Sequence, residues 1–253
     1  MTKTGEIQNI LFGLEAEYSV RILRAVECGS RAWGFESKDS DWDIRFIYMH
    51  NIDWYLGLTE KRDVIEYMQN NLDFVGWDLR KALRLAKKYN PALLEWLKSP
   101  ITYYGHGGFW VFLRNLMEEH FSPKPLAYHY LHMAEGNYIS YFKGNTVSRK
   151  KYFYVLRPLM AVAWLKRYNI LPPISFADTY KNLELDKEIE ETLDQLIKEK
   201  KVGMEKDPTP RIKILDYLIT DLIQEAKDFC LIAEVCAIPL KELNNLFLRT
   251  LRD

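Results

Sequence analysis

The sequence has no excess of charge of either sign, since 35 lysines and arginines balance 35 aspartates and glutamates. A chain with zero net charge is not expected to present a broad basic surface, so any contact with nucleic acid should be local. Cysteine is also scarce: three residues match no zinc-binding spacing and cannot all pair with one another. Reduced, buried thiols in a cytoplasmic protein are therefore expected.

Long hydrophobic runs and internal repeats are missing as well. No apolar run approaches the roughly 18 residues of a membrane-spanning helix. The N-terminal segment lacks the charged-then-apolar pattern of a secretory signal. We therefore expect no membrane partner. With 253 residues, the chain has the length of one large domain or two small ones.

One stretch, residues 29–45, lies between two predicted strands. Apolar residues recur at a period of two over residues 20–28 and again over residues 41–50. Side chains two positions apart on a strand share a face, so Asp41 and Asp43 are expected to point the same way, about 7 Å apart. The apolar residues that alternate with them should then turn into a core.

The chemistry of this stretch points to a metal and a phosphate. Two neighbouring carboxylates suit a hard divalent cation, and the Gly29-Ser30 turn offers a closely approachable backbone and a hydroxyl. A short helix that begins at this turn would direct its first N–H groups at a phosphate. A calcium-binding loop that begins at Asp39 is excluded, because Ile44 and His50 occupy its required glycine and glutamate positions. The pattern therefore suits phosphoryl transfer from a nucleotide.

The stretch reads Gly-Ser-Arg-Ala-Trp-Gly-Phe-Glu-Ser-Lys-Asp-Ser-Asp-Trp-Asp-Ile-Arg. It resembles the DNA polymerase β superfamily of nucleotidyltransferases, whose hallmark is Gly-Ser, a spacer and Asp-x-Asp, and within it the RlaP (RNA-ligase-associated) branch. The resemblance implies an enzyme that uses Mg²⁺ or Mn²⁺ to move a nucleoside monophosphate from an NTP to a hydroxyl acceptor. An RNA end, a tRNA, a protein and a small molecule all stay open as acceptors. The alternative is a catalytically inactive nucleotide-sensing or partner-binding module on the same fold.

The resemblance also implies a set of three metal-binding, catalytic carboxylates. Asp41 and Asp43 supply two of them, and the superfamily places the third on a neighbouring strand. Asp73 falls within a predicted strand over residues 72–77, flanked by apolar side chains, whereas Asp78 is explained as the N-cap of the helix that follows. We therefore predict Asp73 as the third ligand.

Nucleotide contacts are implied at Gly29, Ser30 and Arg31, beside the carboxylates. The family also has a Lys-Tyr-x-Tyr-x-x-Arg run in its helical half, facing the catalytic cleft. Here that run begins at Lys151 and ends at Arg157, which implies contacts with the triphosphate or the acceptor. A solvated helical face explains these two cations equally well.

Two further charged residues and the overall fold complete the expectations. Arg45 is a candidate to steady the acids or neutralise phosphate, and Glu95 a candidate for a capping or supporting role.

The pattern predicts an α+β fold, with a small mixed β-sheet nucleotidyltransferase core flanked by helices and then a C-terminal helical domain. The expected division is a catalytic domain over residues 1–105 and a helical domain over residues 106–253 that closes the cleft.

Overall fold

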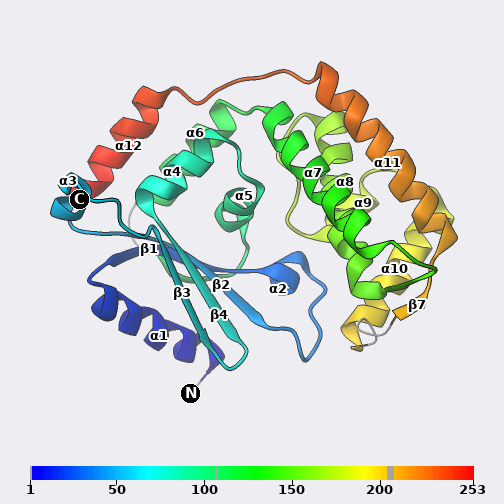
Figure 1. The fold of residues 1–253 in the computed structure, drawn as a ribbon, viewed down its shortest axis with the longest axis horizontal. Coiled ribbons are helices and arrows are strands. Elements are labelled where there is room, and N and C mark those ends of the chain that lie inside the picture. Colours follow the sequence, from blue (N-terminus) through cyan, green and yellow to red (C-terminus); the bar gives the residue numbers. More distant parts are fainter. Residues whose placement is uncertain (1, 106–107, 204–207) are drawn as a thin grey trace. The chain divides into compact units, whose positions relative to one another are not determined.

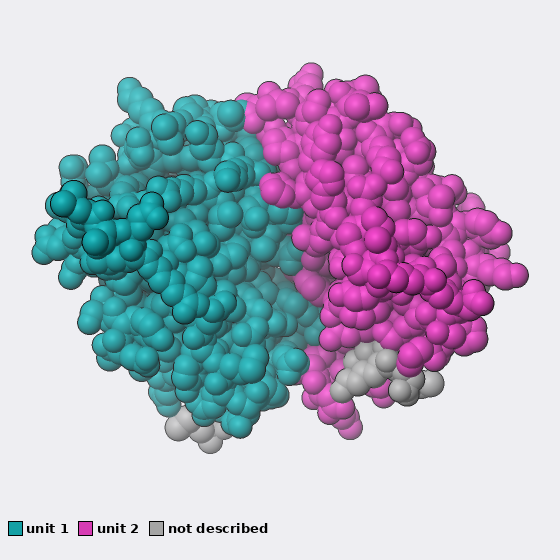
Figure 2. Space-filling view, viewed as in Figure 1, with its two compact units in different colours: residues 1–32, 41–121, 237–253 teal, residues 33–40, 122–236 magenta. Residues whose placement is uncertain are grey.

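The computed structural model describes residues 2–105, 108–203 and 208–253. These residues form two compact units, coloured separately in Figure 2. Unit 1 holds residues 1–32, 41–121 and 237–253, and unit 2 holds residues 33–40 and 122–236. The division predicted at residues 105 and 106 stays a prediction, and residues 106 and 107 lie outside the described part of the chain.

A five-stranded mixed sheet forms the centre of unit 1 (Figure 1). Its strand order is β3-β4-β2-β1-β5; β2 and β4 are parallel, and every other neighbouring pair is antiparallel. The predicted α+β fold with a small mixed sheet and flanking helices is confirmed. The strands are β1 (Arg21–Cys28), β2 (Trp42–Met49), β3 (Val64–Gln69), β4 (Leu72–Asp78) and β5 (Thr102–Gly105).

One face of the sheet packs against helix α1 (Lys3–Tyr18). Ile44, Phe46 and Tyr48 alternate along β2 and are each no more than 1% exposed in this core. The residues between them face the other side of the sheet, because successive strand side chains point to opposite faces. The predicted alternation of β2 is thus confirmed, and it sends Asp43 to the face away from α1.

The opposite face is covered by helices that follow β4. The ring of Trp77 on β4 stacks on Trp96 of α5 with centroids 3.8 Å apart. Asn70, in the left-handed region at φ 54°, forms the tight turn between β3 and β4 that Asn70-Asn71 predicts. The other helices of unit 1 are α2 (Gly29–Trp33), α3 (Ile52–Leu56), α4 (Leu79–Lys87), α5 (Pro91–Lys98), α6 (Phe109–Glu119) and α12 (Leu240–Arg252).

Unit 2 is mainly helical, and its core includes the chain segment that follows α2. Phe35 stacks on Phe153 with ring centroids 4.4 Å apart and meets Phe176 edge-on at 6.0 Å. Among the described residues, no helix has both the length and the apolar character needed to cross a membrane. The elements of unit 2 are α7 (Pro123–Tyr141), β6 (Thr146–Ser148), α8 (Arg149–Tyr168), α9 (Phe176–Lys181), α10 (Lys187–Lys201), β7 (Pro208–Pro210) and α11 (Lys213–Ile232).

Candidate active site

The glycine-serine turn lies directly against the carboxylate of Asp43. Gly29 follows β1 and begins α2 with φ +62°, a conformation that L side chains rarely adopt. A Cβ atom at this position would lie 2.0 Å from Oδ2 of Asp43. Only glycine therefore fits at residue 29 while Asp43 keeps its position. Ser30 follows in the first turn of α2 and is partly exposed.

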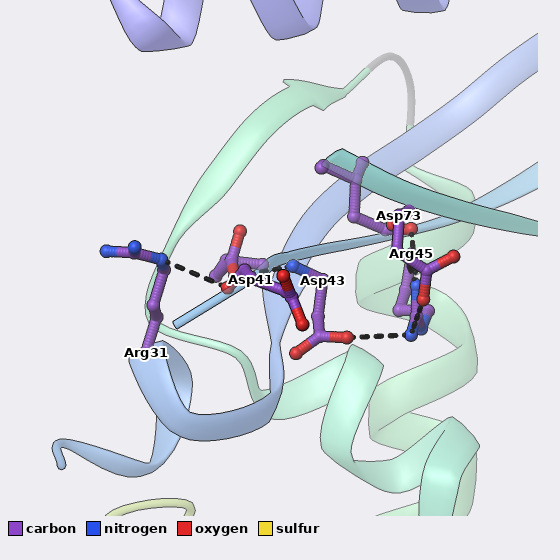
Figure 3. A network of polar contacts seen from close by, with 7 residues as sticks. Arg31, Asp41, Asp43, Arg45 and Asp73 are labelled. Atoms are coloured by element: carbon purple, nitrogen blue, oxygen red, sulfur yellow. Dashed lines mark hydrogen bonds and ion pairs between the residues drawn. The ribbon is translucent and has the colours of Figure 1, made fainter. Parts of the chain in front are cut away.

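Asp43 and Asp73 are direct neighbours in the sheet. The parallel pairing of β2 with β4 sets them opposite each other, so their side chains share a face. Arg45 bridges them: its Nη2 donates to Oδ1 of Asp43 at 2.9 Å and to Oδ2 of Asp73 at 2.8 Å (Figure 3). Its Nη1 donates to the backbone carbonyls of Ile44 at 3.1 Å and Asp73 at 2.9 Å. The guanidinium is thus fixed to both strands.

Asp41 precedes β2 and has an exposed side chain. Arg31 Nε donates to the backbone carbonyl of Asp41 at 3.3 Å, and its guanidinium lies 3.8 Å from the ring centroid of Trp42. These contacts hold the entry to β2 beside the turn. Within the described residues, no three histidine, cysteine, aspartate or glutamate side chains gather in an arrangement ready to hold a metal ion. Asp43 and Asp73 come together, and Arg45 offsets their mutual repulsion.

Glu27 is a site residue that the sequence reasoning missed. Its carboxylate is fully buried and accepts the backbone N–H of Asp43 at 2.9 Å and the hydroxyl of Tyr103 at 2.5 Å. Burial raises the pKa of Glu27 from 4.5 to about 7, and these two hydrogen bonds oppose the shift. The available signal was an acidic residue among the apolar residues that end the strand, two positions before Gly29.

Asp78 lies at the other end of β4, away from the carboxylate pair. Its side chain is 1% exposed and accepts the backbone N–H of Arg80 at 2.8 Å, which caps α4. It also accepts the hydroxyl of Tyr55 at 2.6 Å. The predicted N-cap at Asp78 is therefore found, and Asp73 is the acid that the fold places beside Asp43.

Glu95 lies inside α5 and is buried, so it is not the capping residue of that helix. Asn90 has that role, because its Oδ1 accepts the backbone N–H of Leu93 at 3.2 Å. Burial raises the pKa of the Cys28 thiol well above its usual value, and the negative charge of Glu95 adds to the shift. Glu95 thus stands near the residue that precedes the glycine turn.

Lys151 and Arg157 lie on α8 in unit 2. The Lys151 ammonium is 3.7 Å from the ring centroid of Tyr141 and 5.0 Å from that of Tyr154. The Arg157 guanidinium is 3.9 Å from the ring centroid of Trp33. Both cations are thus partly buried against aromatic faces.

Residues 4–249 match the family described as the RNA repair pathway DNA polymerase beta family, RlaP. The protein YcgL of Bacillus subtilis (strain 168), itself described as uncharacterized, is 42% identical over 243 residues, which are 95% of this chain and 93% of YcgL. A solved nucleotidyltransferase-like protein from Exiguobacterium sibiricum 255-15 is 11% identical with a TM-score of 0.36, over 88% of this chain and 76% of that one. That structural likeness is too distant to add to the sequence match. The chain belongs to the RNA repair pathway DNA polymerase beta family, as its glycine-serine and Asp-x-Asp residues predict.

Proposed function

We propose that this protein transfers a nucleoside monophosphate from an NTP to a hydroxyl group and releases pyrophosphate. The observation that carries the proposal is the pairing of Asp43 with Asp73 directly beside the Gly29-Ser30 turn. Acids for a cation and a backbone turn for phosphate are the two components that such a reaction needs.

The donor chemistry of the site fits a divalent metal ion. Asp41, Asp43 and Asp73 offer carboxylate oxygens, which Mg²⁺ and Mn²⁺ prefer over nitrogen or sulfur. Arg45 engages one oxygen of Asp43 and one of Asp73 and keeps both side chains in register. A bound divalent ion would lower the pKa of an acceptor hydroxyl and offset the charge of the departing pyrophosphate. We infer that these three acids hold it.

The chain's own residues would bind and orient the triphosphate. Gly29 gives the phosphates close access to the backbone, and the Ser30 hydroxyl offers a hydrogen bond. Arg31, held on the indole of Trp42, is placed to neutralise phosphate charge at the same turn. Little covalent work falls to the protein in phosphoryl transfer, because positioning and charge neutralisation supply most of the rate.

We also propose that Lys151 and Arg157 contact the triphosphate or the acceptor. Tyr141 and Tyr154 lie beside Lys151 and could stack on an exposed base. The binding constant for an RNA acceptor should then fall only gradually with salt, with a slope of about 1 to 3 when its logarithm is plotted against the logarithm of salt concentration. A Lys151→Ala, Arg157→Ala double variant should bind it more weakly, whereas unchanged binding would remove both residues from the proposal.

The test is to incubate the protein with each labelled NTP, Mg²⁺ and separate sets of RNAs, tRNAs, proteins and small hydroxyl compounds, and to follow the label. Label on one acceptor class, together with release of pyrophosphate, supports the transfer. The alternative function is a catalytically inactive nucleotide-sensing module, which is favoured by the lack of a preformed three-ligand group among the described residues. Tight NTP binding with no pyrophosphate release under any of these conditions would select it. We place the reaction in the cytoplasm, in keeping with three cysteines that form no disulfide.

A further inference from the structure

A polar cavity lies at the far end of β4 from Asp73. Its volume is about 210 Å³. We name it the distal pocket; it is separated from Asp73 by roughly 16 Å along the strand, the rise of five residues. It is smaller than the roughly 300 Å³ at which pockets for whole small molecules begin, so it suits one compact group. Its lining comes from α3, the loop after it and the start of α4, namely Trp54, residues 57–61, Asp63, Asp78, Arg80, Lys81 and Arg84.

Four cations line the distal pocket, and two of its three carboxylates are already engaged. Asp63 accepts the Lys81 ammonium at 3.0 Å. Asp78 is buried and serves as the cap of α4 and the acceptor of the Tyr55 hydroxyl. Neither of these acids is therefore placed to repel an anion strongly.

Lys81 is paired with Asp63, and Arg80 Nη2 donates to the backbone carbonyl of Tyr55 at 3.1 Å. The remaining two cations are Lys61 and Arg84. Arg84 is exposed and has no ion-pair partner among the described residues. The Lys61 ammonium lies 5.5 Å from the ring centroid of Trp54, which makes the indole part of a cationic rim. Glu60 is the third acid, on the exposed loop. The lining thus carries one excess positive charge, and its uncompensated cations are an arginine and a lysine.

We propose that the distal pocket binds the phosphate group of a phosphomonoester, at a site separate from Asp43 and Asp73. Arginine and lysine donate charge-assisted hydrogen bonds to phosphate oxygens, and a dianion gains from both. The pocket volume holds the phosphate, while the Trp54 indole, stacked on His50 with ring centroids 4.1 Å apart, lies at the rim and would report on binding there. A free nucleotide and the phosphorylated end of a nucleic acid share this chemistry. The proposal does not depend on nucleotidyl transfer at the carboxylate pair.

The pocket is tested by titration with the indole N–H signal of Trp54 as the readout, assigned by its loss in Trp54→Phe. The probes are inorganic phosphate, AMP and adenosine, all in the presence of a chelator so that no divalent ion takes part. AMP and inorganic phosphate should shift the signal in a saturable way, and adenosine should not. Adenosine acting as strongly as AMP, or no shift with AMP, would overturn the proposal.

Charge variants give the second part of the test. A Lys61→Gln, Arg84→Gln double variant should bind AMP at least tenfold more weakly, while Glu60→Gln should bind it about twofold more tightly. Lys87→Gln, on the same helix but outside the lining, is the matched control and should bind as wild type does. Provided that circular dichroism shows both variants to be folded, equal binding of AMP by the double variant and the control would reject the pocket.

Two further arms separate this site from the proposed active site and identify the source of the phosphate. AMP binding should persist in Asp43→Asn, whereas its loss there would assign the signal to the carboxylate site and refute the distal pocket. A 5′-phosphorylated RNA oligonucleotide that binds more tightly than AMP identifies a nucleic-acid end, and equal affinity identifies a free nucleotide. An oligonucleotide that binds equally well with a 5′-hydroxyl would contradict recognition of a monoester.

Discussion

Strand β4 carries an aspartate near each end, and the two have different surroundings. The side chain of Asp73 is 29% exposed and shares a guanidinium with Asp43. Asp78 is 1% exposed, and its oxygens accept a helix N–H and the Tyr55 hydroxyl. Burial raises the pKa of Asp78, whereas the same hydrogen bonds oppose that rise. Asp78 is thus committed to the fold, while Asp73 has a charged partner and solvent on one side.

The difference shows that an acidic residue's function follows from what already satisfies its oxygens. A carboxylate that caps a helix and accepts a buried hydroxyl cannot serve a ligand without losing those bonds, each costing roughly 1–3 kcal/mol to leave unmade. A carboxylate held by one arginine can keep that contact and still bind. Asp73 should therefore matter for activity and Asp78 for stability.

The largest expected effect is on catalysis. Asp43→Asn and Asp73→Asn should each slow pyrophosphate release about a thousandfold, or roughly 4 kcal/mol of transition-state stabilisation, because each removes an anionic ligand and nearly keeps its shape. Thermal unfolding should change little, since both side chains are partly exposed. Single-turnover rates measure the effect, with the NTP from which the wild-type protein releases pyrophosphate. Wild-type rates with a continued need for metal would reject the two residues as ligands.

The opposite end of β4 should respond in stability. Asp78→Ala should lower the free energy of unfolding by about 2–3 kcal/mol, because α4 loses its cap and the Tyr55 hydroxyl loses its acceptor. Asp78→Ser should recover about 1 kcal/mol of this loss, since serine also caps helices. Urea denaturation measures both, and activity per folded molecule should stay at the wild-type level. Loss of activity in an Asp78→Ser variant that still folds would show that Asp78 serves activity as well as stability, contrary to its assignment to stability alone.

Glu27 is buried like Asp78 but lies beside Asp43, so it tests whether burial or location determines the effect of an acidic residue. Its folded-state pKa of about 7 exceeds the ordinary value of 4.5, so the folded protein binds more protons between these two values. The stabilising contribution is complete below pH about 4.5 and is lost as the pH rises towards about 7, a decline of about 3 kcal/mol. In the absence of metal, Glu27→Gln should flatten the unfolding free energy across this window. A decline unchanged in the variant would assign it to other groups.

The smallest effect concerns the arginine between the two acids. Arg45→Lys keeps the positive charge but loses the planar fork that reaches Asp43 and Asp73 together. The rate should fall about tenfold, close to 1.4 kcal/mol, with the unfolding free energy within about 0.5 kcal/mol of wild type. A rate equal to wild type would show that charge alone suffices and that the bridging geometry is dispensable.

Much of the fold follows from periodicity in the sequence. The alternation of apolar residues predicts strand β2, and the Asn70-Asn71 pair predicts the β3–β4 turn. Both signals are local, since one is side-chain spacing and the other is the type of two adjacent residues. Strand β5 was not predicted: it is short, follows Pro100 and pairs with β1 from a distant part of the chain. Segment 33–40 packs in unit 2 through Phe35, and no local pattern indicates which core receives an aromatic ring.

The site was less predictable than the fold. Spacing along the sequence relates Asp41 to Asp43, but the partner across the sheet depends on register. The resemblance indicated a third acid on a neighbouring strand, and the apolar flanks of Asp73 selected it over Asp78. Arg45 was a candidate from its proximity, and its bridge between two strands became visible only in three dimensions. Glu27 escaped notice because its polar partners come from β2 and β5, so its burial looks unfavourable in one dimension.

The parallel pairing of β2 with β4 has a consequence for the order of folding. The β3–β4 hairpin closes over a tight turn, whereas β2 can pair with β4 only after the segment containing α3 and β3 has looped back. Longer loops cost more entropy to close, so we expect the hairpin to form early and the β2–β4 contact late. In φ-value analysis, substitutions across the Tyr67–Phe74 pair should then give higher values than substitutions at Arg45, and the opposite order would contradict this sequence of events. The two acids would then meet only once the rest of the sheet exists, so an incompletely folded chain would lack the assembled carboxylate pair.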